Sequence, residues 1–224
     1  MHSDHDNFPS GLLTLLCEGS NNPFSKNYSR KLRVGARGHV FIGKGYNLTL
    51  EGEKQALHDL IEIGVQKHKA QMIAKAATLK GLEAQQFIKF YMKETMLSDS
   101  QEEKLFKLRY LRAQALLQKK VDGVSDGPGF ISAFNIPPYQ LEVLVDFIYS
   151  GDLSSSSEDK VFKVLRTSLI ENKKNIFDRL VLDVNYWRQM KVPEDRLRMR
   201  CIYVREWKNF SGILFPFIYY VTHL

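Results

Sequence analysis

Glu18 is an isolated acidic residue, since no other Asp or Glu occurs between Asp6 and Glu51. It follows the apolar run "LLTLLC" (12–17) and precedes a stretch of turn-forming residues, so it falls at the end of a predicted short helix. A carboxyl group in such a position can keep its proton near neutral pH when apolar neighbours disfavour its charged form. Glu18 is therefore a candidate proton donor for general acid catalysis.

Basic side chains gather in the loop after Glu18 and offer another interpretation of it. A solvent-exposed Glu18 could simply pair with Arg30 or Arg33. Over the whole chain, 32 Lys and Arg face 25 Asp and Glu, a net charge of +7. This excess indicates an anionic partner, such as nucleic acid, an acidic membrane face or bacterial cell wall. The basic residues of the loop are Lys26, Arg30, Lys31, Arg33 and Arg37.

Two glycines in "VFIGKGYNL" (40–48) indicate a tight turn where a side chain would obstruct. These glycines are Gly43 and Gly45. Tyr46 and Asn47 follow them and could stack on a sugar or form hydrogen bonds with it. Packing in the core is an equal alternative for Tyr46.

Other residues of reactive types are weaker candidates for a functional site. Cys17 could act as a nucleophile with His39, but its apolar surroundings favour a buried thiol. The segment "HSDH" (2–5) is typical of a solvated terminus rather than a metal site, and we expect no metal or cofactor. Two cysteines exclude a disulfide-dense secreted scaffold.

Hydrophobic spacing predicts a hairpin followed by helices. Ser10 can cap the first helix, which ends near Gly19, and "LRVGARGHVFIG" (32–43) is typical of a β-hairpin. The first of the later predicted helices carries Ala56, Leu57, Leu60 and Ile61 and ends at Gly64, and two more cover 67–79 and 83–96. Capping boxes at Ser98–Gln101 and Ser155–Glu158 each begin a helix, and between these two helices Pro begins another in "PPYQLEVLVDFIYSGD". The last two predicted helices are one that carries Ile176, Leu180, Val184 and Trp187 and one after Pro193.

These elements predict an α+β, mostly α fold, with a small hairpin-bearing N-terminal lobe packed on a larger helical lobe. A cleft between two such lobes is the usual place for a site. We expect a flexible leader over 1–9, one domain over 10–211 and an apolar tail over 212–224 that packs on it. The leader lacks a signal-peptide pattern, and the tail is too short to span a bilayer.

Five segments resemble the phage-type (T4-like) lysozymes, which are muramidases, and they occur in the family's order across residues 10–210. The resemblance implies a lysozyme-like fold and cleavage of peptidoglycan between N-acetylmuramic acid and N-acetylglucosamine, by hydrolysis or by lytic transglycosylation. The segments are "LLTLLCEG" (12–19), "VFIGKGYNL" (40–48), "LSDSQEEKLF" (97–106), "IPPYQLEVLVDFIYSG" (136–151), and Trp187 with "DRLRMRCIYVREWKNF" (195–210).

The resemblance makes Glu18 the general acid and the Gly43–Gly45 turn the floor of the cleft. It implies substrate binding by Gly43, Gly45, Tyr46 and Asn47, to which we add Arg30 and Arg37 from the basic loop.

The chain departs from the family at three positions. The loop after Glu18 lacks the usual Asp, Phe41 stands in place of a Thr, and Ser150 stands where Asn is common. Two carboxylates normally share glycosidic cleavage. A second acid could come from Glu51 or Glu53, whose alternative role is interaction with a helix dipole. Otherwise a lone glutamate performs transglycosylation, or the chain binds glycan without cutting it.

The expected partner is the peptidoglycan glycan strand. An immunity protein that binds the chain is a further possible partner. We expect a monomer that neither inserts stably into membranes nor binds nucleic acid, because no DNA- or RNA-binding motif is recognisable. A basic helical nucleic-acid binder is the remaining class. The protein would be made in a bacterial or phage-infected cytoplasm, delivered as an endolysin or secreted effector, and act at the cell wall or periplasm.

Overall fold

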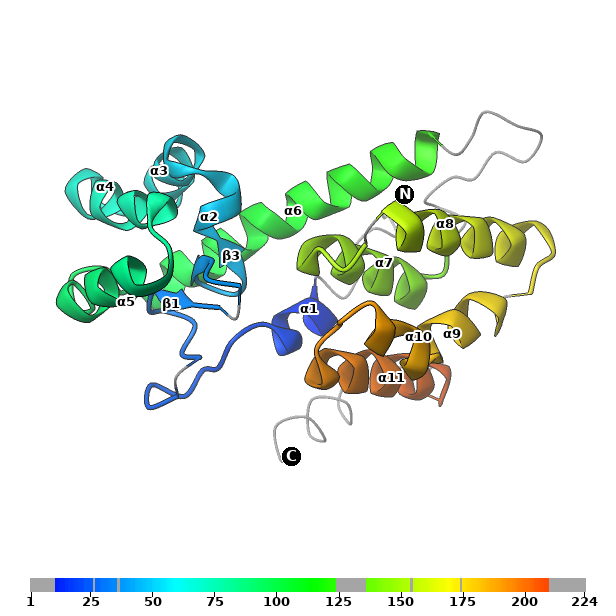
Figure 1. Cartoon of the computed structure of the whole chain (residues 1–224). Helices are drawn as coiled ribbons and strands as arrows, with labels where there is room; N and C mark the ends of the chain where they lie inside the picture. Colours follow the sequence, from blue (N-terminus) through cyan, green and yellow to red (C-terminus); the bar gives the residue numbers. More distant parts are fainter. Residues whose placement is uncertain are drawn as a thin grey trace. The chain divides into compact units, whose positions relative to one another are not determined.

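The computed structural model describes residues 11–25, 27–35, 37–123, 136–153, 155–173 and 175–209 (Figure 1). These residues form many helices and one three-stranded antiparallel sheet, which confirms an α+β, mostly α fold. The predicted leader, the Ser10 cap, the apolar tail and Lys26 lie outside the described residues. The chain divides into two compact units, Glu18–Leu111 and a second that joins Met1–Cys17 to Arg112–Leu224.

The sheet of the unit Glu18–Leu111 is built on the predicted hairpin. Strand β1 (Arg33–Val34) pairs with β2 (Val40–Ile42), and β2 pairs with β3 (Tyr46–Asn47). Phe41 lies opposite both Arg33 and Asn47 in the two pairings. Strand β3 was not predicted, because two residues are too few to show a period of two.

Helices complete this unit around an apolar core. α2 packs against β2, and α5 packs against β1 (Figure 1). Ile42, Leu60, Ile73 and Leu105 are completely buried there. The helices are α2 (Leu48–Glu51), α3 (Glu53–Glu62), α4 (Lys67–Lys75), the 3-10 helix η2 (Ala76–Thr78), α5 (Gly81–Phe90) and the first part of α6 (Asp99–Gly123).

The segment before α6 confirms one prediction and corrects another. Ser98 and Gln101 form the expected capping box: the Gln101 amide donates to Ser98 Oγ (3.2 Å), and the Ser98 amide donates to Gln101 Oε1 (3.0 Å). The helix predicted over 83–96 was too long, since α5 ends at Phe90. The Leu97 amide instead donates to the Arg30 carbonyl (3.0 Å), which a continued helix would not allow.

The second unit is all helical in its described part. α1 packs on α7 and α11, and the Leu13 amide donates to Glu142 on α7 (3.1 Å). The single helix predicted through Leu180 and Trp187 is two helices, because the Asp183 side chain accepts from the Tyr186 amide (3.0 Å) and starts a new one. The elements are α1 (Leu12–Cys17), the rest of α6, α7 (Pro138–Ser150), α8 (Ser155–Ile170), α9 (Asn175–Leu182), α10 (Val184–Gln189) and α11 (Glu194–Asn209).

A buried ionic network joins α7 to α11. Asp146 is fully buried and accepts from Arg196 Nη1 (2.8 Å) and Arg200 Nε (2.7 Å). Arg200 Nη2 also donates to Asp152 (2.6 Å) and to Ser150 Oγ (3.1 Å). Only 1% of Arg200 is exposed. Ser150, which stands where the resemblance to phage-type lysozymes implies Asn, belongs to this network.

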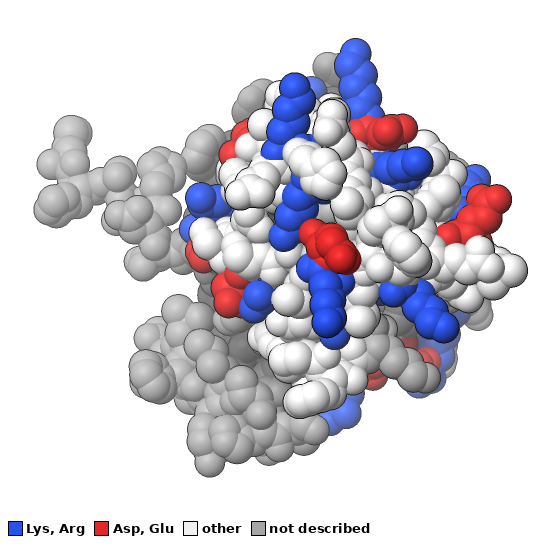
Figure 2. Space-filling view, turned by 90° about the vertical axis from the view of Figure 1, so that its left-hand side faces the viewer, with Lys and Arg blue, Asp and Glu red and all other residues white. Residues whose placement is uncertain are grey.

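Among the described helices, none is long and apolar enough to cross a membrane. Cys17 is half-buried and Cys201 is buried, and they form no disulfide. On the face drawn in Figure 2, Lys and Arg side chains are spread out with Asp and Glu among them.

Candidate functional site

The carboxylate of Glu18 lies directly against the backbone of Gly45. A Cβ atom at Gly45 would come within 2.4 Å of Glu18 Oε2 and 3.0 Å of Oε1, closer than such atoms can approach. The φ angle of Gly45 is +76°, which side chains also disfavour. The backbone conformation therefore favours glycine at this position, and any side chain there would displace the Glu18 carboxylate from its present place.

The turn that carries Gly45 is closed internally. The Gly45 amide donates to the Gly43 carbonyl (2.9 Å), and Gly43 has a φ of +62°. A Cβ atom at Gly43 would meet the buried Leu105 side chain at 3.2 Å. Gly43 thus faces the core, whereas Gly45 faces Glu18.

Two arginines hold the carbonyl groups of this turn. Arg33 Nη2 donates to the Gly43 carbonyl (2.9 Å), and Arg109 Nη1 on α6 donates to the Gly45 carbonyl. Arg33 also lies beside the residue after Glu18, because a Cβ atom at Gly19 would be 3.5 Å from Arg33 Nη2. The two arginines fix the turn against which Glu18 rests, and they occupy carbonyl groups that a sugar could otherwise have used.

Lys44, between the two glycines, is a buried cation. Its Nζ donates to Asn21 Oδ1 (2.6 Å), and 6% of the residue is exposed. Burial lowers the pKa of Lys44, and the positive charge of nearby Arg33 lowers it further. The negative charges of Glu102 and Glu18 act in the opposite direction. Lys44 therefore lies within electrostatic reach of two carboxylates, Glu18 and Glu102.

Glu102, which lies on α6, is a second carboxylate near Lys44, in addition to Glu18. Its Oε1 atom is buried and accepts no hydrogen bond from the described residues. Glu102 and Arg109 are seven residues apart, with the buried Leu105 and Phe106 between them at helical spacing. This helical spacing indicates that both charged residues lie on the inward side of α6, but neither was predicted as a site residue.

Phe41, which stands where the resemblance to phage-type lysozymes implies Thr, is half-buried on β2. Its neighbours Val40 and Ile42 are fully buried, so Phe41 lies on the opposite face of the strand. The Arg33 guanidinium lies 5.9 Å from the centre of the Phe41 ring. A Cβ atom at Gly35 would come within 2.7 Å of this ring. Phe41 thus supplies packing for the hairpin and for Arg33.

Tyr46 and Asn47 have structural partners. Tyr46 is 1% exposed and donates to Asp59 Oδ2 (2.6 Å), so the core-packing alternative is the one observed. Asn47 accepts from the Leu50 amide (3.2 Å), which caps α2, and its Nδ2 lies 3.1 Å from His39 Nδ1.

The remaining predicted site residues lie elsewhere. Arg30 Nε donates to the Leu97 carbonyl (2.8 Å). Arg37 is exposed in the connection between β1 and β2. Glu51 ends α2 and Glu53 begins α3, so both lie at a helix junction. Of the predicted set, Glu18 and the Gly43–Gly45 turn are the residues that the structure brings together. Cys17 belongs to the unit that does not contain His39.

One group on α3 has metal-binding residue types. The ligand atoms of His58, Asp59 and Glu62 lie within 4.8 Å of one another. Asp59, however, is completely buried and accepts from Tyr46 and from Gln55 Nε2 (2.7 Å). These hydrogen bonds give Asp59 a structural role without a metal.

Comparison with known proteins adds a family without an assigned activity. No curated protein and no solved structure matches the chain. A family model described as a domain of unknown function (DUF8812) matches residues 11–201, which is most of the chain and spans both compact units. The chain therefore belongs to the DUF8812 family.

Proposed function

We propose that the protein cleaves the glycan strand of peptidoglycan between N-acetylmuramic acid and N-acetylglucosamine, with Glu18 as the general acid. The observation that carries this proposal is the contact between the Glu18 carboxylate and the Gly45 backbone. The lysozyme resemblance assigns both residues to one cleft. The contact supports that assignment, because residues 27 positions apart meet at van der Waals distance.

The first chemical step needs only Glu18. A protonated Glu18 donates its proton to the glycosidic oxygen as the bond to the anomeric carbon breaks. Arg33 and Arg109 contribute indirectly, since they hold the turn that positions Glu18. Such positioning matters because small displacements of a catalytic group reduce rates strongly.

The second step favours lytic transglycosylation. Glu51 and Glu53 lie at the α2–α3 junction, and an oxygen of Glu102 is buried. The loop after Glu18 carries no Asp or Glu before Glu51, so it supplies no neighbouring acid to activate a water, and transglycosylation needs none. In transglycosylation a hydroxyl of the substrate attacks the anomeric carbon and returns its proton to the Glu18 carboxylate, which restores the acid and leaves an anhydro end on the product.

The positive charge supports an anionic substrate. Arg33 and Arg109 lie beside the turn, and the whole chain carries a net charge of +7. Carboxylates of peptidoglycan stem peptides would be attracted to such a surface. The proposed place of action is the cell wall or periplasm.

The second candidate is a protein of the same fold that binds glycan without cutting it. The observation that favours it is Phe41 at the family's Thr position, because a phenyl ring cannot orient a water by hydrogen bonding.

Analysis of digestion products separates these possibilities. The wild type and the Glu18→Gln and Glu83→Gln variants would be incubated with purified peptidoglycan, and released fragments identified by mass. We expect anhydro-ended fragments from the wild type and from Glu83→Gln, whose change lies on an exposed part of α5, and none from Glu18→Gln. Reducing ends would indicate hydrolysis, with Glu51, Glu53 and Glu102 the next residues to replace. Binding of glycan without release by the wild type would favour the second candidate.

A further inference from the structure

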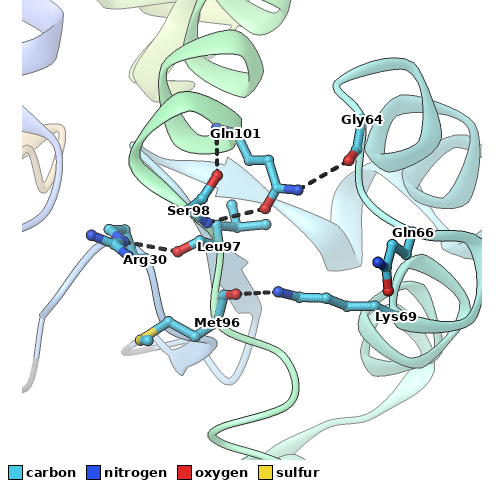
Figure 3. Close-up of a pocket in the computed structure, with 8 residues that line it drawn as sticks. All are labelled: Arg30, Gly64, Gln66, Lys69, Met96, Leu97, Ser98 and Gln101. Carbon is cyan, nitrogen blue, oxygen red and sulfur yellow. Dashed lines mark hydrogen bonds between the residues drawn. The ribbon is translucent and has the colours of Figure 1, made fainter.

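A pocket of about 490 Å³ opens beside the start of α6 (Figure 3). Three segments of the unit Glu18–Leu111 contribute its lining residues, which are Arg30, then Gly64, Gln66 and Lys69, and then Met96, Leu97, Ser98 and Gln101. This volume lies within the range of about 300–1,000 Å³ that is typical of small-molecule sites. None of the candidate catalytic residues lines it.

Two cations are fixed in the wall of the pocket. Lys69 Nζ donates to the Met96 carbonyl, and Arg30 Nε donates to the neighbouring Leu97 carbonyl (2.8 Å). Figure 3 shows the Lys69 side chain extended across one side of the pocket toward Met96. Both cationic groups are therefore held in place before any ligand arrives, which reduces the entropy lost on binding.

The positive charge of the pocket is incompletely compensated. Among the described residues that line it, none is acidic. Asp99 pairs with Arg30 (2.6 Å) from outside the lining, and its side chain is 87% exposed. Burial lowers the pKa of Lys69, and the positive charge of Arg30 lowers it further, so the two cations disfavour one another. An anion between them would relieve this repulsion.

Neutral polar groups complete the lining. Gln101 Nε2 donates to the Gly64 carbonyl (3.0 Å), which ties α6 to the connection between α3 and α4. The exposed Gln66 side chain lies at the start of α4. These carboxamides can form hydrogen bonds with the uncharged part of a ligand.

We propose that this pocket binds a polar small molecule that carries one phosphate or carboxylate group. The oxyanion lies between Arg30 and Lys69, and the carboxamides of Gln66 and Gln101 contact the neutral remainder. The inference is independent of the proposed glycan cleavage.

Amide shift titration of the full ¹⁵N-labelled chain tests this site. The probes are glycerol phosphate with glycerol as its neutral counterpart, and N-acetyl-alanyl-alanine with its C-terminal amide as the neutral counterpart. We expect saturable shifts around Gln66, Lys69 and Gln101 with at least one anionic probe and not with its neutral counterpart. The probe that binds identifies phosphate or carboxylate as the preferred group. No saturable shift with either anion, or equal shifts with the neutral probes, would overturn the proposal.

A matched pair of variants localises the binding. Gln66→Glu puts a negative charge at the pocket and should weaken anion binding about tenfold or more, because like charges repel across a partly dry site. Gln71→Glu makes the same change at an exposed position of α4 outside the lining and should leave the affinity within about twofold. Lys69→Met should reduce the affinity as well, with circular dichroism to verify folding. Equal affinities of Gln66→Glu and Gln71→Glu would contradict the assignment.

Discussion

The Glu18 carboxylate and the backbone of Gly45 are in such close contact that a single methyl group at position 45 would lie 2.4 Å from Glu18 Oε2. The turn that presents Gly45 is held by Arg33 and Arg109 through its two glycine carbonyls. The Glu18 carboxylate therefore lies against a turn whose carbonyl groups are held by two side chains, and a side chain at position 45 would displace it.

Replacement of Gly45 by alanine should abolish glycan cleavage. The new methyl group would displace Glu18, in addition to a backbone strain of about 1 kcal/mol at positive φ. Gly151→Ala is the matched control, since Gly151 has a similar φ of +71° and open space around it. It should lose only the strain energy in thermal unfolding and keep the activity. Equal activity of the two variants would show that the contact has no catalytic importance.

The buried Lys44 should make the free energy of unfolding vary with pH in the alkaline range. Its pKa is lowered in the folded state, so between that value and the ordinary value of 10.5 the unfolded chain binds more protons than the folded one. The free energy of unfolding therefore rises with pH through this window. A Lys44→Met variant should lack this part of the rise.

Denaturant unfolding at pH values from 7 to about 10.5 measures the difference between wild type and variant. Lys54→Met, at an exposed position of α3, is the control and should follow the wild-type curve. A Lys44→Met curve parallel to the wild-type curve at every pH would contradict the assignment.

Replacement of Asp146 should strongly reduce the stability of the second unit. Burial alone would raise its pKa, but Arg196 and Arg200 outweigh this and hold it below the ordinary value of 3.8. Asp146→Asn removes the carboxylate that both buried guanidinium groups share, which leaves Arg200 with Asp152 alone, and should destabilise folding by about 3–5 kcal/mol.

The wild type should lose this contribution gradually as the pH falls from about 3.8, where Asp146 of the unfolded chain takes up its proton, through the lower pKa of the folded state. Chemical denaturation at pH 7 and pH 3 tests both statements, with the exposed Asp159→Asn on α8 as the control. A loss for Asp146→Asn no larger than that for Asp159→Asn would show that the network contributes little.

Local sequence signals predicted most elements, and long-range contacts account for the rest. The Ser98–Gln101 capping box, the hairpin and the proline-opened α7 all depend on neighbouring residues, and each occurs as expected. The break between α9 and α10 was missed, because apolar spacing continues past Asp183 while its side chain caps a new helix.

The site was only partly predictable for the same reason. Glu18 was singled out as an isolated acid and the two glycines as a tight turn, and the resemblance to a family assigned both to one cleft. Lys44 and Arg109 were missed, because a charged residue is normally assigned to a solvated surface. Arg109 reaches the Gly45 carbonyl from 64 residues away, and no local pattern contains that contact.

The most direct test of the account is the initial rate at which soluble fragments leave peptidoglycan, measured for the wild type and Glu18→Gln at equal concentration of folded protein. General acid catalysis contributes about 10²- to 10⁴-fold to a rate, so we predict a loss of that size with the thermal stability changed little. A Glu18→Gln variant that releases fragments at the wild-type rate would contradict the central claim that Glu18 is the acid.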